Sequence, residues 1–177
     1  MSAVLMAACA GLWRRTLLIE ADGSRVPGGN VRWLQGESVY VDSRGFGGVL
    51  EQRENVFEWH RAIDLEPPGP FPDVGEMHWD GEILVETGVH ADYVEHWVRD
   101  DTPHTPSWAL TVRSADAGDA LLLRVGTAFG WLRSTAVMLA VVGGDEWNAL
   151  APRLSEGELN ADGARWTIVQ SEGNVEL

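Results

Sequence analysis

The chain has 177 residues, of which 45% are hydrophobic and 23% are charged. These values are typical of a soluble globular protein that can bury a sizeable core. The 27 acidic and 13 basic side chains give a formal net charge of −14. Because this charge repels phosphate backbones and anionic lipid surfaces, we expect neither nucleic acid nor a membrane as a partner. A solvated acidic surface that aids solubility is favoured over a field that evolved to attract cations.

Cys9 is the single cysteine, which excludes an intrachain disulfide and a thiolate metal cluster. Residues 1–10 are apolar and rich in small residues, but no basic segment precedes them as in a secretory signal. No other stretch approaches the roughly 18 apolar residues that span a bilayer. We therefore expect a cytoplasmic protein in which residues 2–10 form a short helix or an extended lead-in.

Apolar and polar residues alternate along the first hundred positions, which is typical of half-buried strands. In the first of these strands, at 12–20, the alternation places Trp13, Leu17 and Ile19 on one face. Further strands are predicted at 31–35, 39–44, 49–51, 56–64, 76–79, 82–86 and 92–99.

Turn residues separate these strands. Asp80-Gly81 predicts a tight hairpin, and the glycines at 45, 47 and 48 predict a bend or a bulge. The proline-rich stretch at 67–72 fits either an interdomain linker or a stiff loop across a barrel mouth. Since the composition is the same on both sides of this stretch, we prefer the loop.

The remainder of the chain continues the pattern up to a long connection at 144–163, in which one helical turn is expected around 146–150. Strands are predicted around 108–112 and at 120–125, 135–142, 165–169 and 174–177. Roughly ten strands with turn signals about every 8–12 residues favour an all-β antiparallel sandwich or barrel. Closure removes exposed strand edges, so we predict a closed or nearly closed barrel of about 8–10 strands, formed as a single domain by residues 1–177.

Two sets of residues resemble known families. Gly11-Leu12-Trp13 is similar to the Gly-x-Trp sequence that opens lipocalin barrels. This resemblance implies that Trp13 plugs the closed end of the barrel and that an arginine, either Arg133 or Arg165, covers it.

The second resemblance extends over about residues 31–100. The matching segments resemble, in order, those of calycin-like proteins from fungi and bacteria, and imply a calycin-type antiparallel barrel. Most calycins carry small apolar molecules and a minority are enzymes, so the fold alone does not define the activity. The segments are Trp33-Leu34, Val39-Tyr40, Glu86-Thr87-Gly88-Val89 and Tyr93 with Glu95-His96-Trp97.

Neighbouring residues of a strand point to opposite faces, so the pairs Trp59-His60 and His96-Trp97 allow two arrangements. If the tryptophans face inward, Arg61 and Glu95 also lie inside, where they should meet each other or a polar guest. If the histidines face inward, His60 and His96 line the interior. The first arrangement buries more aromatic area and is preferred.

The preferred arrangement predicts a polar patch inside an aromatic pocket. There the planar guanidinium of Arg61 would face a carboxylate or another oxyanion of a ligand. The alternative is a buried ion pair that closes the barrel without a ligand, and both interpretations remain open. The candidate ligand-binding residues are Trp13, Trp33, Tyr40, Phe57, Trp59, Arg61, Glu86, Tyr93 and Trp97.

Three functions fit this pattern. The leading one is a barrel that binds an amphipathic or aromatic small molecule with a polar or anionic group. The second is a cofactor-free isomerase, lyase or cyclase in which Glu95 or His60 transfers a proton. The third is a protein-interaction module that docks a partner through residues 67–72 and the acidic surface.

No motif in the sequence indicates a cofactor or a metal, and we expect neither. His60, His78, His90 and His96 lack a metal-binding spacing and would converge on a metal only through the fold. The sequence does not determine the oligomeric state.

Overall fold

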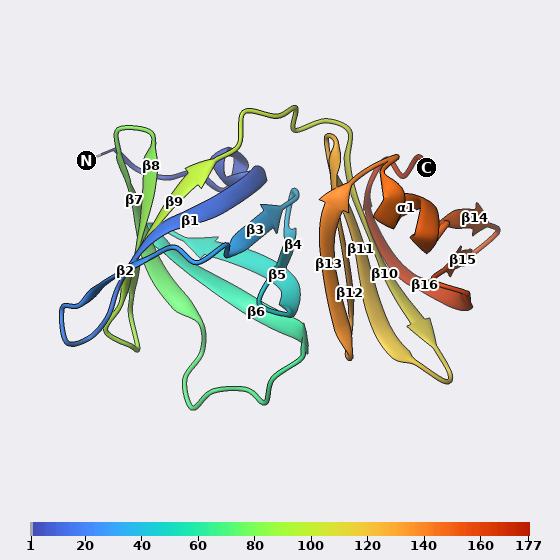
Figure 1. Ribbon diagram of the computed structural model, residues 1–177, viewed down its shortest axis with the longest axis horizontal. Coiled ribbons are helices and arrows are strands. Elements are labelled where there is room, and N and C mark those ends of the chain that lie inside the picture. The colour runs from blue at the N-terminus through green and yellow to red at the C-terminus, as the bar shows by residue number, and fades with distance from the viewer. Residues whose placement is uncertain (1) are drawn as a thin grey trace.

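The computed structural model describes residues 2–177 and consists of two lobes, each built on one antiparallel sheet (Figure 1). In the first lobe, β1 pairs with both β3 and β9, so that β1 and β3–β9 close into an eight-stranded barrel. The short β2 pairs only with β1. The elements are η1 (Met6–Cys9), β1 (Gly11–Ile19), β2 (Arg25–Pro27), β3 (Arg32–Gln35), β4 (Val39–Asp42), β5 (Phe46–Arg53), β6 (Val56–Asp64), β7 (Val74–Asp80), β8 (Ile83–Gly88) and β9 (Val94–Arg99).

The second lobe is a seven-stranded half-barrel in the order β13-β12-β11-β10-β16-β15-β14. The predicted fold class, a closed antiparallel barrel with a short lead-in, is therefore confirmed, although the barrel uses only residues 11–99. The elements of this lobe are β10 (Ser107–Ser114), β11 (Gly118–Val125), β12 (Ala128–Arg133), β13 (Ala136–Val141), α1 (Asp145–Leu150), β14 (Arg153–Ser155), β15 (Glu158–Ala161) and β16 (Ala164–Gly173).

Three details of the second lobe differ from the sequence prediction. Strand β12 was not predicted, because its residues are buried on both faces and show no alternation. The connection at 144–163 contains β14 and β15 in addition to the expected helical turn. The strand expected at 174–177 is absent, since these residues have no regular structure.

A bulge in β1 changes which of its side chains enter the barrel. The register between β1 and β9 shifts between Arg15 and Leu17, so that Leu18, rather than Leu17, faces the interior together with Arg15. The predicted face of Trp13, Leu17 and Ile19 is therefore wrong beyond Trp13, because simple alternation does not continue through a bulge.

A second bulge lies between β5 and β6. The partners of Gly47 and Gly48 are Ile63 and Arg61, which leaves Ala62 unpaired. Trp59 and Arg61 consequently face the barrel interior, whereas Ile63 joins the cluster between the lobes. This arrangement confirms the bulge that the glycines predicted.

Trp13 closes one end of the barrel, as the lipocalin resemblance implied. Its ring stacks on Trp33 at 5.6 Å, and its indole N–H donates to the Cys9 carbonyl at 2.7 Å. The covering arginine is Arg99, whose guanidinium lies 5.2 Å from the ring centroid. The choice of Arg133 or Arg165 was wrong, because both belong to the other sheet, whereas β9 carries Arg99 beside β1.

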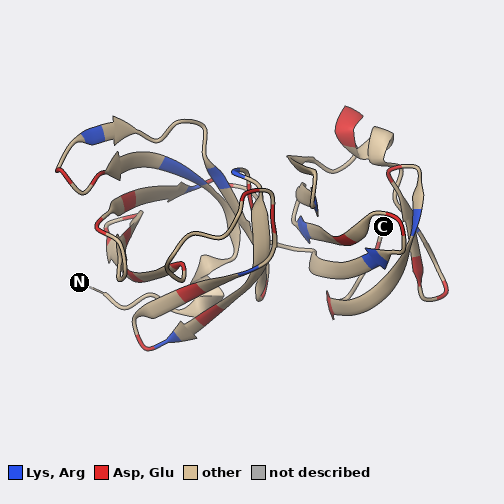
Figure 2. Ribbon diagram, turned by 90° about the horizontal axis from the view of Figure 1, so that it is seen from below, with Lys and Arg blue, Asp and Glu red and all other residues tan. Residues whose placement is uncertain are grey.

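The lead-in η1 packs under this end of the barrel and buries Cys9 completely. Burial raises the pKa of the Cys9 thiol to about 12, and the charge of Arg99 offsets only part of that effect. Acidic residues are spread over the strands and turns of both lobes (Figure 2). Within residues 2–177, no helix is long and apolar enough to cross a bilayer.

An apolar cluster joins the outer face of β3–β6 to the second sheet. Two glycines allow the close approach: a Cβ at Gly47 would lie 2.8 Å from Leu132, and one at Gly130 would lie 3.0 Å from Val41. The carboxylate of Glu172 accepts a bond from the backbone N–H of Ser38 at 2.9 Å. The cluster contains Leu34, Val39, Val41, Ile63, Ala109, Leu121, Leu123, Val125, Ala128 and Leu132.

Because the two lobes share this cluster, we propose that residues 2–177 unfold as one cooperative unit. Leu34→Ala removes a fully buried side chain of the interface and should lower the free energy of unfolding by about 2–5 kcal/mol. Denaturant unfolding followed by tryptophan fluorescence and by circular dichroism should give one coincident transition. Leu154→Ala, at a side chain that is 40% exposed, serves as the control. Two separate transitions would contradict the proposal.

Candidate functional site

The barrel interior is packed at the end closed by Trp13 and hollow at the other end. The hollow is a cavity of about 290 Å³. Trp33 separates the two halves, because it stacks on Trp13 and also lines the cavity. The lining residues are Arg15, Leu18, Trp33, Asp42, Arg44, Phe46, Trp59, Arg61, Asp73, Glu86, Tyr93, Glu95 and Trp97.

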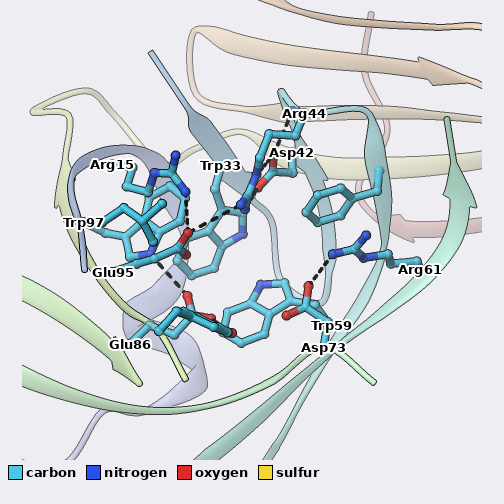
Figure 3. Close-up of a pocket in the computed structure, with 13 residues that line it drawn as sticks. Arg15, Trp33, Asp42, Arg44, Trp59, Arg61, Asp73, Glu86, Glu95 and Trp97 are labelled. Atoms are coloured by element: carbon cyan, nitrogen blue, oxygen red, sulfur yellow. Dashed lines mark hydrogen bonds and ion pairs between the residues drawn. The ribbon is translucent and has the colours of Figure 1, made fainter. Parts of the chain in front are cut away.

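A chain of ion pairs crosses this cavity (Figure 3). Glu95 of β9 is 5% exposed, and its Oε1 lies 2.5 Å from a guanidinium nitrogen of Arg15 and 3.4 Å from one of Arg44. Arg44 continues to Asp42 through two hydrogen bonds of 2.8 and 2.9 Å. Burial lowers the pKa of Arg44, but the bonds and charge of Asp42 outweigh that effect, so the pKa is raised overall. Arg44 therefore stays charged, and its bonds to Asp42 hold its guanidinium in place.

Arg61 forms a separate group at the edge of the cavity. Its guanidinium binds Asp73 at 2.9 Å and Asp64 at 3.1 Å, and lies over the ring of Phe46 at 3.6 Å. Of the two alternatives for Arg61 and Glu95, a mutual pair is not formed. Asp64 and Asp73 bind the guanidinium of Arg61, whereas Glu95 pairs with Arg15 and Arg44. Arg61 does face inward with Trp59, as preferred from the sequence.

Glu86 of β8 is the acidic residue of the cavity without a cationic partner. It is 4% exposed and accepts hydrogen bonds from the Tyr93 hydroxyl at 2.8 Å and the Trp97 indole at 3.2 Å. It stands directly opposite Glu95 in the sheet. Burial, followed by the charges of Glu95 and Asp73, raises the pKa of Glu86 well above its ordinary value of 4.5. Burial therefore favours the protonated form of this carboxyl group in the folded protein.

Indole rings form the rigid wall of the cavity. The ring of Trp33 meets those of Trp59 and Trp97 edge to face, at 5.7 Å in both cases. The indole N–H of Trp33 donates to Gln35 at 3.0 Å, which fixes the ring further. Edge-to-face contacts of this kind orient aromatic side chains, so the cavity has a defined shape before any ligand enters.

The cavity opens toward the proline-rich loop between β6 and β7. An outer hollow of about 420 Å³ under this loop shares Trp59, Arg61, Asp73 and Tyr93 with the inner cavity. Phe71 of the loop is 62% exposed and stacks on His90 of the loop between β8 and β9, with ring centroids 6.3 Å apart. The stretch at 67–72 therefore lies at the mouth of the barrel, as the loop interpretation predicted.

Apart from His60, the predicted site residues fall into two groups. Trp13, Tyr40 and Phe57 are fully buried in the packed part of the barrel and do not line the cavity. The others meet around it, and they are Trp33, Trp59, Arg61, Glu86, Tyr93, Glu95 and Trp97.

His60 lies on the outside of the barrel, where it lines the outer hollow under the proline-rich loop and not the inner cavity. Its side chain is 45% exposed and lies between Glu51 at 3.2 Å and Glu58 at 3.0 Å. The expectation that His60 acts inside the barrel is wrong, because Trp59 and Arg61 take the inward positions of β6.

Four charged residues of the cavity were not predicted. Arg15 was missed because of the bulge that follows it, and Asp73 because it follows an irregular loop. Asp42 could have been found, since it lies two residues after Tyr40, which the sequence placed inward. Arg44 lies in the turn after β4 and enters the site through its bonds to Asp42. Among residues 2–177, no cluster of three or more His, Cys, Asp or Glu side chains can hold a metal.

Neither protein-family models nor curated protein sequences show a match to the chain. Among solved structures, the chain is similar to the crystal structure of the uncharacterized protein YLR301w from Saccharomyces cerevisiae, with a TM-score of 0.58 and 14% identity. The match covers 92% of this chain and 98% of the yeast chain. At this identity the likeness concerns the fold alone, and it includes both lobes.

The raised pKa of Glu86 predicts a specific pH dependence of stability. Above pH 4.5 the unfolded chain releases the Glu86 proton while the folded protein retains it, so stability falls until the pH passes the raised folded value. Glu86→Gln removes this effect. Its free energy of unfolding should therefore rise relative to that of the unmodified protein as the pH increases above 4.5, until the pH passes the raised pKa of Glu86 in the folded protein.

Urea unfolding over a pH series measures this difference. Glu76→Gln is the matched control, because Glu76 is exposed on the neighbouring strand β7. If the difference in the free energy of unfolding between Glu86→Gln and the unmodified protein stays constant with pH, the pKa of Glu86 is not raised by folding.

Proposed function

We propose that the protein binds a small aromatic or amphipathic molecule with a polar group in the barrel cavity. The observation that supports this proposal most directly is a hollow lined by indole rings, in which ion pairs already hold charged side chains in place. Its volume of about 290 Å³ is near the lower end of ligand sites, roughly 300–1,000 Å³, and suits a single ring system with a short substituent. The resemblance to calycins, most of which carry small molecules, supports the same function.

The alternative of a buried ion pair without a ligand accounts for only part of this geometry. A structural ion pair explains Arg15, Glu95 and Arg44, which link β1, β9 and the turn after β4. It does not require an adjoining hollow, an uncompensated Glu86 or an opening toward the proline-rich loop. These three features favour a site for a guest.

Filling the cavity should abolish binding without unfolding the barrel. Leu18→Trp adds a large side chain at the cavity wall, whereas Leu154→Trp adds the same side chain at a position that is 40% exposed. Native mass spectrometry should detect a copurifying small molecule in the unmodified protein and in Leu154→Trp, but not in Leu18→Trp. A panel of aromatic and amphipathic compounds should likewise quench the tryptophan fluorescence of the unmodified protein and of Leu154→Trp, but not that of Leu18→Trp. Equal ligand content in all three proteins would contradict the proposed site.

The opposed carboxyl groups of Glu86 and Glu95 favour a cofactor-free isomerase as a second candidate. Their environments differ, since Glu95 is paired with two guanidiniums whereas Glu86 receives only neutral donors. A protonated acid beside a carboxylate is the arrangement that a proton-transfer reaction needs.

If the protein is such an enzyme, incubating the copurified molecule with the protein in D₂O should introduce deuterium at the reacting carbon. Glu95→Gln should lose the exchange in whatever fraction of the protein still contains ligand, because an amide cannot accept the substrate proton. Mass spectrometry of the recovered molecule measures the uptake, with Glu76→Gln as the control. Unchanged exchange in Glu95→Gln would exclude Glu95 from proton transfer.

A further inference from the structure

The charges that line the cavity do not balance. Its three guanidiniums, on Arg15, Arg44 and Arg61, each have at least one carboxylate partner within ion-pair distance. The cavity also contains four acidic residues, namely Asp42, Asp73, Glu86 and Glu95.

Glu86 is the acidic residue that remains after this pairing. Within residues 2–177, Glu86 accepts side-chain hydrogen bonds from Tyr93 and Trp97, and both donors are neutral. A carboxyl group buried to this degree is stable only if it holds a proton or meets a cation.

We infer that the ligand carries a basic amine, which binds as an ammonium ion against Glu86. This inference rests on the proposed function and specifies the polar group of the same ligand. The negative charges of Glu95 and Asp73 act on the position of Glu86 more strongly than the positive charge of Arg44. A potential of this sign opposes the ionisation of Glu86 and, for the same reason, attracts a cation placed beside it.

The aromatic wall is also suited to a cation. Trp33, Trp59 and Trp97 line the same cavity as Glu86, and indole is the ring that attracts a cation most strongly. One face of Phe46 is already occupied by the guanidinium of Arg61, so the protein itself places a cation on an aromatic ring here. The overall charge of −14 also favours the approach of a cation from solvent.

An anionic group fits this cavity less well than the sequence suggested. To reach Arg61 it would have to compete with Asp64 and Asp73, and at Arg44 it would have to compete with Asp42. It would also lie near Glu86 and Glu95, and so would add negative charge to a site that already has an excess of acid.

Three probes that share a benzyl group and differ in the polar end test the inference. They are phenethylamine, which is cationic, phenethyl alcohol, which is neutral, and phenylacetate, which is anionic. Isothermal titration calorimetry at neutral pH should show that the amine binds about tenfold or more tightly than the alcohol, and that phenylacetate binds most weakly. Glu86→Gln keeps the size and the hydrogen-bonding oxygen of the side chain but cannot carry the charge. It should lower the affinity for the amine by about tenfold and so reduce the preference for the amine over the alcohol.

Glu76→Gln, which removes the same charge from the outside of β7, should leave all three affinities unchanged. Equal binding of amine and alcohol, or preferential binding of phenylacetate, would overturn the inference while leaving a ligand-binding barrel in place. The same holds for a preference for the amine that persists in Glu86→Gln. Failure of all three probes to bind, together with no copurifying molecule in the unmodified protein, would overturn the proposed function as well.

Discussion

The ion pairs that Glu95 forms with Arg15 and Arg44 determine what the barrel interior can be. They connect strand β9 to β1 and to the turn after β4, across a space that apolar side chains would otherwise fill. Breaking a buried pair costs about 3–5 kcal/mol, so Arg15 and Glu95, whose side chains are mostly buried, hold each other in position. These paired side chains and the tryptophans line the same hollow. The candidate site depends on this constraint.

The second lobe supports the same part of the barrel from outside. Leu34 and Val41 of β3 and β4 pack against the second sheet, and Glu172 of that sheet binds the backbone between these two strands. Strand β4 ends at Asp42, which holds Arg44. The wall that carries these two charged residues is thus supported from outside by the second sheet, whereas the mouth near Phe71 is bordered by loops. This difference places the rigid part of the site on the sheet and the opening under the proline-rich loop.

Much of the barrel could be predicted from the sequence because alternation reports burial on one face. Trp59 and Trp97 followed that rule, and their inward orientation brought Arg61 and Glu95 inside as well. Alternation failed where the backbone carries an extra residue, as at Thr16, and where both faces are buried, as in β12. The partners of Arg61 could not be predicted, since Asp73 reaches it through an irregular loop. The separation into two lobes could not be predicted either, because the amino-acid composition does not change between them.

The buried cysteine has a practical consequence. Cys9 is shielded by the lead-in segment and by Trp13, and its thiol holds its proton up to about pH 12. Since only the thiolate reacts readily with alkylating reagents and oxidants, the native molecule should be inert to both. The chain thus carries a natural reporter at the sealed pole of its barrel, where the rate of chemical labelling measures how often that pole opens.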